Sequence, residues 1–188
     1  MREDREDIGE GGPKHRLVMV VVAWVLGVDM ISKAWVQSRF QLGESVGVLG
    51  DWLRLTYVLN PGAAFGIHVG PWSRPLFVTL ALLALVVLAN VVRLTPPQER
   101  LRLWALALIM GGALGNLTDR LRAHASVVDF LDVGVGRLRW PVFNVADVGV
   151  TVGAVLLVML LWGEEAMEPA EVPAAGAGSG GTGSRSPS

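Results

Sequence analysis

The sequence predicts a mainly α membrane protein: four transmembrane helices with a small extracytoplasmic β platform between the first and second helices. Its 188 residues have a mean hydropathy of +0.47, and 52% of them are hydrophobic. These apolar residues are gathered into blocks, and about 20 mostly apolar residues in a row can cross a bilayer. Four blocks qualify or nearly do: Leu17 to Val36, Pro75 to Val92, Leu101 to Leu117 and Phe143 to Trp162.

The first block could be a cleavable signal sequence, because Lys14 and Arg16 precede the apolar run LVMVVVAWVLGV. The run continues through Asp29 into Lys33, however, and no small-x-small cleavage site follows promptly. We therefore expect a retained helix, an N-terminal segment over residues 1–16 and a membrane domain over residues 17–162. Residues 163–188 turn acidic and then rich in Gly and Ser, a composition typical of a disordered tail without chemistry.

The composition excludes several kinds of chemistry. The net charge is −1, so no basic surface indicates nucleic acid as a partner. The chain has no cysteine, which removes disulfides, thiol catalysis and thiolate metal sites. No HExxH motif occurs, and His15, His68 and His124 are scattered, so no metal or other cofactor is expected.

The connection between the first two blocks is too long for a turn. Within it, DWLRLTYVLN alternates apolar and polar residues in the manner of a strand. NPGAAFG follows, in which Asn60-Pro61-Gly62 predicts a turn, and Ala63, Ala64 and Gly66 are small enough for another backbone to approach closely. We expect a small platform above the helices.

An even number of spans places both termini on one side of the membrane. Lys14 and Arg16, with Arg93, Arg100 and Arg102 in the second connection, favour the cytoplasm for that side. Three arginines in the third connection weaken this asymmetry. They are Arg122, Arg137 and Arg139.

With this topology the polar residues of the spans converge on the outer face. Asp29 lies seven residues before Val36, or roughly 10 Å below the outer end of its helix at 1.5 Å per residue. Asn116, Asp119 and Arg120 close the third span, whereas Asn144 and Asp147 open the fourth. Small residues at GxxxG spacing would allow the third and fourth helices to approach closely there. These residues are Gly111, Gly115, Gly149 and Gly153.

Charged residues inside spans are costly, so each one is a candidate for function. Asp29 and Lys33 lie four residues apart on one helical face, and a structural, self-neutralising pair is as good an explanation as a functional one. Asn116, Asp119 and Arg120 also share one face, where Arg120 could hold a carboxylate or a polar substrate group. Ordinary decoration of a helix end explains this triplet equally well.

Asp129 and Asp147 both lie in apolar stretches. Two carboxyl groups brought together in a partly dry site tend to share one proton, so one can deprotonate a water while the other polarises an amide carbonyl. That is the chemistry of an aspartic peptidase. The alternatives are a solvated loop acid for Asp129 and a helix N-cap or first-turn acid for Asp147.

Ser45 lies in GESVG, which fits the GxSxG pattern of a serine nucleophile. That motif functions on a strand–turn–helix elbow of a large α/β sheet, for which this chain has no room. We therefore do not expect Ser45 to act as a nucleophile.

Five ordered blocks make the chain resemble bacterial lipoprotein signal peptidase, also called signal peptidase II. They are DMISKAW from Asp29, NPGAAFG from Asn60, GGALGNLTDR from Gly111, VVDF from Val127 and FNVAD from Phe143. Together they cover about residues 17 to 162, and five ordered blocks on a four-span frame are highly specific.

The resemblance implies an intramembrane aspartic endopeptidase that cuts prolipoproteins before a diacylglyceryl-modified cysteine at the outer face of the bacterial cytoplasmic membrane. It implies Asp129 and Asp147 as the catalytic pair. It also implies substrate-positioning or pair-supporting roles for Asn60, Gly62, Asn116, Arg120 and Asn144, and structural support from Asp29, Lys33 and Asp119. The implied partners are prolipoproteins and membrane lipid, the implied inhibitor is globomycin, and a monomer is expected.

Two other classes remain open from the residues alone. A small transporter or proton channel would also place Asp, Lys and Arg in spans, but it would need a polar path across the whole bilayer, and the inner halves of the second and fourth spans are almost purely apolar. A non-catalytic membrane scaffold would have no use for two buried carboxylates near one face.

Overall fold

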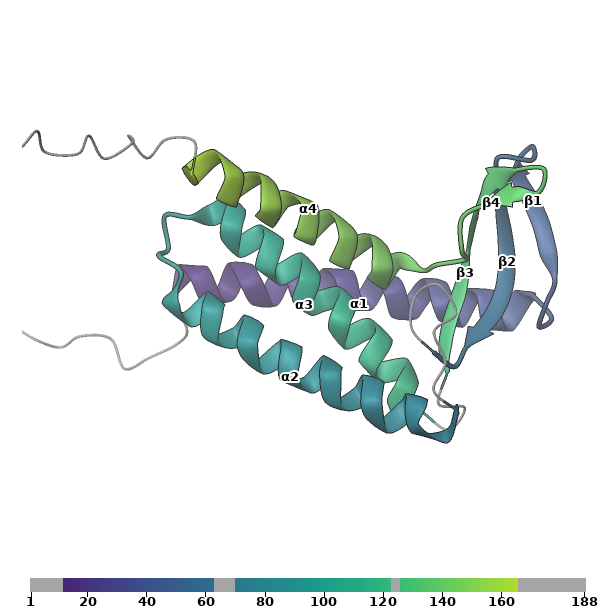
Figure 1. Ribbon diagram of the computed structural model, residues 1–188, viewed down its shortest axis with the longest axis horizontal. Coiled ribbons are helices and arrows are strands. Elements are labelled where there is room, and N and C mark those ends of the chain that lie inside the picture. The colour runs from purple at the N-terminus through teal and green to yellow at the C-terminus, as the bar shows by residue number, and fades with distance from the viewer. Residues whose placement is uncertain (1–11, 63–69, 123–125, 166–188) are drawn as a thin grey trace, which may run out of the picture.

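The computed structural model describes residues 12–62, 70–122 and 126–165, and these form a bundle of four long helices with a small sheet at one end (Figure 1). All four helices are long and apolar enough to cross a membrane, which confirms the predicted fold class. In Figure 1, α3 lies between α2 and α4, and α1 crosses behind it. The helices are α1 Pro13–Arg39, α2 Ser73–Leu94, α3 Arg100–Leu121 and α4 Val145–Glu165.

The helices differ from the predicted apolar blocks mainly at their ends. The α1 helix begins four residues before the block, with Pro13 in its first turn, and it continues through the polar residues that precede Phe40. The α4 helix begins two residues later than predicted because Phe143 forms a bridge with Leu131 of the sheet. Residues 163–165 continue α4, and the rest of the predicted tail lies outside the described residues.

The sheet has four antiparallel strands in the order β1-β2-β3-β4. Strand β2 confirms the predicted strand, although Asp51 and Trp52 belong to the preceding turn. The sheet is larger than the expected platform, because β3 and β4 come from the connection between α3 and α4. Its strands are β1 Ser45–Leu49, β2 Leu53–Asn60, β3 Val127–Val135 and β4 Leu138–Arg139.

Strand β3 places the chemistry of the third connection in the sheet. The interpretation of Asp129 as a solvated loop acid is wrong, because Asp129 lies in β3 opposite Val58 and its exposed fraction is only 3%. The pairing of β2 with β3 shifts register between Leu55 and Val58. A bulge of this kind bends a strand and re-aims its side chains, and here it lies next to Asp129.

Glycines bring α3 and α4 together, as the GxxxG spacing predicts. A Cβ on Gly153 would lie 2.6 Å from the backbone oxygen of Ala105, and one on Gly115 would lie 3.1 Å from Ala146 Cβ. Gly112, which the spacing did not single out, makes the closest approach, because a Cβ there would lie 2.2 Å from the backbone oxygen of Ala146. The helices can pack at this distance only without side chains.

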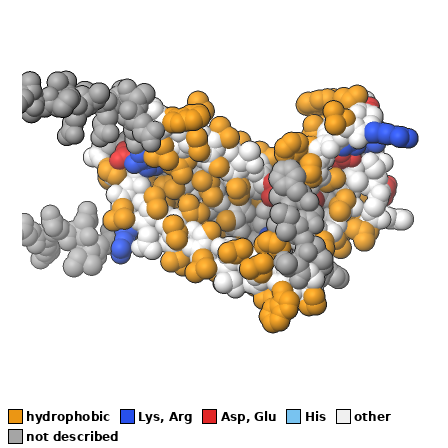
Figure 2. All heavy atoms as spheres, in the orientation of Figure 1, with side chains coloured by type: hydrophobic (Ala, Val, Ile, Leu, Met, Phe, Trp, Pro, Cys, Tyr) orange, Lys and Arg blue, Asp and Glu red, His pale blue; other side chains and the backbone are white. Residues whose placement is uncertain are grey.

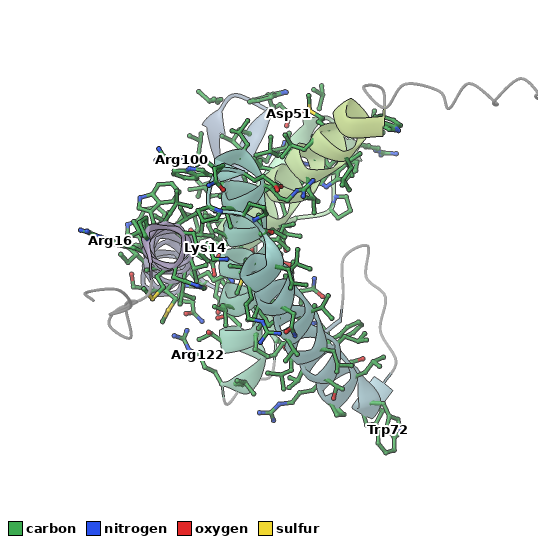
Figure 3. All side chains as sticks on the ribbon, turned by 90° about the vertical axis from the view of Figure 1, so that its left-hand side faces the viewer. Lys14, Arg16, Asp51, Trp72, Arg100 and Arg122 are labelled. Atoms are coloured by element: carbon green, nitrogen blue, oxygen red, sulfur yellow. The ribbon has the colours of Figure 1, made fainter. Side chains whose placement is uncertain are left out.

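Basic side chains cap the C-terminal ends of α2 and α3. Lys14 Nζ donates to the carbonyl oxygens of Arg93 and Thr95 at 2.8 and 3.1 Å, where α2 ends. Figure 3 shows Lys14 between α1 and its neighbours, whereas Arg16 points away from the bundle. At the other end, Arg74 donates to the carbonyl oxygen of Arg120 at 3.0 Å, where α3 ends. Cations favour helix C-termini because the last carbonyls lack partners.

The core of the bundle is small and most large apolar side chains face outward. The buried cluster joins α1 and α3 through residues such as Val21, Val25, Leu103 and Leu106. Figure 2 shows hydrophobic side chains spread over the helices and charged ones near the two ends of the visible face. This distribution suits a bundle whose outer surface contacts lipid.

We predict that Gly112→Ala lowers the thermal unfolding temperature of the purified protein, because its methyl group would collide with the backbone of α4. Gly27→Ala is the matched control, since a Cβ at Gly27 of α1 has nothing within 4 Å. In the control the substitution should be neutral or stabilising by up to about 1 kcal/mol through helix propensity. Equal unfolding temperatures for the two variants would contradict the proposed contact.

Candidate active site

A cleft of about 900 Å³ lies where the sheet meets the C-terminal end of α3 and the N-terminal end of α4. Its walls are mostly apolar, with Val58, Val133 and Trp140 from the sheet side and Val148 and Val152 from α4. A cavity of this size and character fits a large, mostly apolar ligand. Six polar residues line it: Asn60, Asn116, Arg120, Asp129, Asp147 and Thr151.

Asp129 enters the cleft from β3 and is held by two side-chain amides. Asn60 Nδ2 donates to its Oδ2 at 3.0 Å, and Asn144 Nδ2 donates to its Oδ1 at 2.6 Å. Burial raises the pKa of Asp129 to about 6, because removal of water disfavours the charged form more than these hydrogen bonds favour it. The negative charge of Asp147 raises the pKa further. The carboxyl group therefore keeps its proton at a pH where a solvated aspartate is ionised.

Asp147 enters the same cleft from the first turn of α4. Its Oδ2 accepts the backbone N–H of Asn144 at 3.2 Å, while Asn144 Oδ1 accepts the backbone N–H of Asp147 at 2.9 Å. This reciprocal pair is a capping box, so the expectation of a first-turn acid is confirmed alongside its position in the cleft. Asn116 Nδ2 donates to the other oxygen, Oδ1, at 2.8 Å.

Asn144 links the two carboxyl groups. Its side-chain oxygen and backbone N–H both bind Asp147, and its side-chain nitrogen binds Asp129. The same nitrogen donates to Asn116 Oδ1 at 3.1 Å, and Asn144 itself is fully buried. One asparagine therefore sets the relative position of the two acids, one on a strand and the other on a helix.

Arg120 belongs to α3 and lines the cleft. Its guanidinium donates to the carbonyl oxygens of Gly62 at 3.0 Å and of Asn116 at 3.2 Å, and it lies over the ring of Phe77 at 5.5 Å. Gly62 in turn donates its N–H to Asn60 Oδ1 at 3.0 Å. These contacts hold the turn after β2 against α3 and leave the remaining guanidinium N–H groups for other partners.

A buried charge cluster supports the site from beneath. Lys33 Nζ is 2.7 Å from Asp29 Oδ2, 2.8 Å from Asp119 Oδ2 and 3.2 Å from Asn116 Oδ1. The predicted pairing of Asp29 with Lys33 is confirmed, and Asp119 joins it. Each acid also binds a backbone N–H: Asp29 accepts that of Ala146 at 2.9 Å, and Asp119 accepts that of Val128 at 3.2 Å. The cluster thus holds the residues immediately before Asp147 and Asp129.

The structure therefore brings together all ten predicted site residues, seven around the cleft and three beneath it, while their assigned roles stay predictions. Ser45 is exposed on β1, and its hydroxyl shares a hydrogen bond with that of Thr56. This is not the surrounding that activates a serine nucleophile.

The sequence reasoning missed Phe77 and the apolar cleft wall. Ala63, Ala64, Gly66, His68 and His124 lie outside the described residues. Within the described part of the chain, no group of three acidic or His residues could hold a metal ion.

We predict that the raised pKa of Asp129 makes stability depend on pH. Between the ordinary value of 3.8 and about 6, the folded protein keeps a proton that the unfolded chain releases. This contribution to the unfolding free energy is therefore fully present below pH 3.8 and is lost as pH rises through about 6. Infrared spectra should show a protonated carboxyl band that disappears at about pH 6. The band should be absent from Asp129→Asn, and its persistence there would contradict the assignment.

We predict that Lys33→Met lowers the unfolding free energy by roughly 3–5 kcal/mol, because it leaves two buried carboxylates without their cation. Arg122→Met is the matched control: Arg122 also pairs with Asp119, at 3.6 Å, but its side chain is 48% exposed. That change should cost at most about 1 kcal/mol. Chemical denaturation of both variants measures the difference, and similar losses would show that burial of Lys33 does not matter.

Comparisons with known proteins agree with this arrangement. Residues 21–162 match the family model described as "Signal peptidase (SPase) II". The chain is 41% identical over 154 residues to the lipoprotein signal peptidase of Moorella thermoacetica, covering 80% of this chain and 98% of that one. It is 43% identical over 145 residues to the lipoprotein signal peptidase of Pelotomaculum thermopropionicum, covering 77% and 90%.

Two solved structures, each titled as a bacterial membrane enzyme, share the fold. The first has a TM-score of 0.74 at 26% identity and covers 82% of this chain and 93% of its own. The second has a TM-score of 0.68 at 28% identity and covers 77% and 91%. Because the family model spans most of the chain and several relatives are about 40% identical along nearly their whole length, this chain belongs to the signal peptidase II family, a family of membrane peptidases.

Proposed function

We propose that this protein removes signal peptides from prolipoproteins as an aspartic endopeptidase, cutting before the diacylglyceryl-modified cysteine. The observation that carries the proposal is the placement of Asp129 and Asp147 from different elements in one apolar cleft, both bound to Asn144. Membership of the signal peptidase II family supports the reaction class, and the apolar cleft supports a lipid-modified substrate.

The surroundings of the two acids support different roles for them. Asp147 accepts N–H donors on both oxygens and lies in the first turn of α4, where the helix dipole favours a negative charge. Asp129 is buried and its pKa is raised to about 6, so it retains a proton more readily. We assign Asp147 as the general base and Asp129 as the general acid.

The reaction then follows from these protonation states. Asp147 takes a proton from a water molecule as the water oxygen bonds to the scissile carbonyl carbon, and Asp129 donates its proton to the carbonyl oxygen. As the tetrahedral intermediate collapses, one of its hydroxyl protons returns to Asp129, the C–N bond breaks, and the proton held by Asp147 passes to the leaving nitrogen. Arg120, with Asn60 and Gly62, would bind the substrate backbone beside the two acids.

The cleft's position suits a substrate that stays in the bilayer. Val148 and Val152 line the cleft and are 41% and 51% exposed on the outer surface of α4. Acyl chains could therefore remain in lipid while the peptide bond enters the cleft.

The distribution of basic residues along the bundle supports one orientation of the protein in the cytoplasmic membrane. Lys14, Arg93 and Arg100 lie at the end of the bundle opposite the cleft, and short basic connections favour the cytoplasmic side. We therefore propose that both termini are cytoplasmic and that the cleft opens at the outer face. The buried apolar core between α1 and α3 at the other end gives no support to a transport path.

We predict that Asp129→Asn and Asp147→Asn each abolish cleavage of a purified diacylglyceryl-modified prolipoprotein while leaving the unfolding temperature within a few degrees of wild type. A gel-shift assay, with the intact mass of the product, reports the loss of the signal peptide and the new N-terminus. Ser45→Ala is the control and should retain full activity. Globomycin should block cleavage by wild type.

Substantial turnover by either Asn variant would disprove the assignment of the pair. Equal cleavage of a prolipoprotein lacking the diacylglyceryl group would disprove the proposed role of the lipid. Loss of activity in Ser45→Ala would instead indicate that Ser45 acts as a nucleophile.

A further inference from the structure

Two neighbouring turns of the sheet carry exposed apolar side chains that the proposed reaction does not use. One is the turn at Gly50–Trp52 between β1 and β2, and the other is the turn at Gly136–Arg137 between β3 and β4. We call these turns and their flanking residues the tip. Its large exposed side chains, with their exposed fractions, are Leu49 58%, Trp52 55%, Val135 65%, Leu138 85% and Trp140 60%.

Four charged side chains of the tip, those of Asp51, Arg54, Asp132 and Arg139, pair with one another. Arg139 binds Asp132 at 2.6 Å and the carbonyl oxygen of Asp51 at 3.0 Å, and Arg54 pairs with Asp51. The backbone N–H of Gly136 also donates to Asp51, and with the two arginines it lowers the pKa of Asp51. Paired polar groups therefore hold the tip together, while large apolar side chains are exposed beside them.

Backbone hydrogen bonds make the two turns one unit. Gly134 donates to the carbonyl oxygen of Trp52 at 3.0 Å, and Trp140 donates to that of Val133 at 2.8 Å. The exposed side chains are therefore presented on a fixed frame. A soluble surface rarely keeps a contiguous apolar patch of this kind without a partner.

The tip lies beside the lipid-facing surface of α4. The upper end of the sheet in Figure 1, where the labels of β1 and β4 stand, extends sideways past the start of α4. Figure 2 shows hydrophobic side chains gathered at this end of the sheet, and Figure 3 shows Asp51 at the margin of the molecule, across the bundle from Trp72. The chain passes from Trp140 to the start of α4 at Val145 in five residues. The tip thus projects sideways beyond the start of α4.

We propose that the tip inserts into the lipid–water interface and is a second membrane anchor beside the four spans. Tryptophan is the residue most typical of this interface, and the tip has two, Trp52 and Trp140. Arg137, exposed in the β3–β4 turn, is placed to reach lipid phosphates. Continuity with the apolar surface of α4 favours lipid over a soluble partner or a second copy of the chain.

This anchor would fix the height of the cleft relative to the bilayer. Asp129 and Val135 belong to the same strand, six residues apart, or roughly 20 Å at 3.3 Å per residue. A rigid strand that rests on the membrane at one end holds Asp129 at a constant depth at the other. The peptide bond next to a lipid-modified residue also lies at a fixed depth in the membrane. The anchor would therefore keep Asp129 at the depth of that bond.

The absence of cysteine allows a direct test by single-cysteine labelling. Leu138→Cys would carry a bimane fluorophore in nanodiscs holding one protein each, with or without brominated acyl chains. Val155→Cys, 55% exposed on α4, is the hydrocarbon reference. Gln41→Cys, which follows α1 at the far end of the sheet, is the aqueous reference. Unchanged unfolding temperatures would verify folding.

We expect quenching by brominated lipid at position 138 to be closer to that at position 155 than to that at position 41. We also expect iodide in the water to quench the probe at position 138 at least threefold less than the probe at position 41. Quenching closer to that at 41 would overturn the proposal. Protection from iodide without quenching by brominated lipid would also overturn it, because some other surface would then cover the tip. Neither readout depends on peptidase activity, so failure here is distinct from failure of the proposed function.

Discussion

The ammonium group of Lys33 is the point on which the rest of the structure depends. It is 1% exposed and contacts Asp29, Asp119 and Asn116. Each contact leads to one part of the cleft: Asp29 to the first turn of α4, Asp119 to the start of β3, and Asn116 to Asp147. A buried charge is stable only when it is paired and hydrogen-bonded, so these partners cannot separate without a large energetic cost.

Among the described residues, neither Lys33 nor Arg120 forms a direct ion pair with Asp129 or Asp147. Lys33 pairs with Asp29 and Asp119, and Arg120 donates to carbonyl oxygens. Within the described residues, the side chains that hydrogen-bond the two acids are neutral amides: those of Asn60, Asn116 and Asn144. A direct ion pair would favour the ionised form of each acid. Neutral donors fix the geometry and still allow one proton to remain on the pair, which is what acid–base chemistry needs.

The membrane explains why this chemistry lies at one end of the bundle. In hydrocarbon every backbone polar group needs an internal partner, and the helix ends obtain theirs from Lys14, Arg74, Asp29 and Asn144. Non-helical backbone can bind a substrate only outside the hydrocarbon or facing a cavity. The sheet supplies that backbone where α3 ends and α4 begins, and its apolar tip continues the lipid-facing surface beyond the helices.

The sequence alone determined the four spans, the strand before Asn60 and the close approach of α3 and α4, because apolar run length, residue alternation and glycine spacing are local patterns. Charged and amide residues in apolar stretches are rare, which marked most of the site residues, and the resemblance to signal peptidase II added others of the ten, including Asn60 and Gly62. Only the tertiary structure decided that residues 127–135 form a strand opposite β2, that Asn144 links both acids, and that Lys33 contacts three residues. Strand pairing and buried ion contacts join residues about 70 to 90 positions apart, as in Asn60 with Asp129 and Lys33 with Asp119, and no local pattern specifies them.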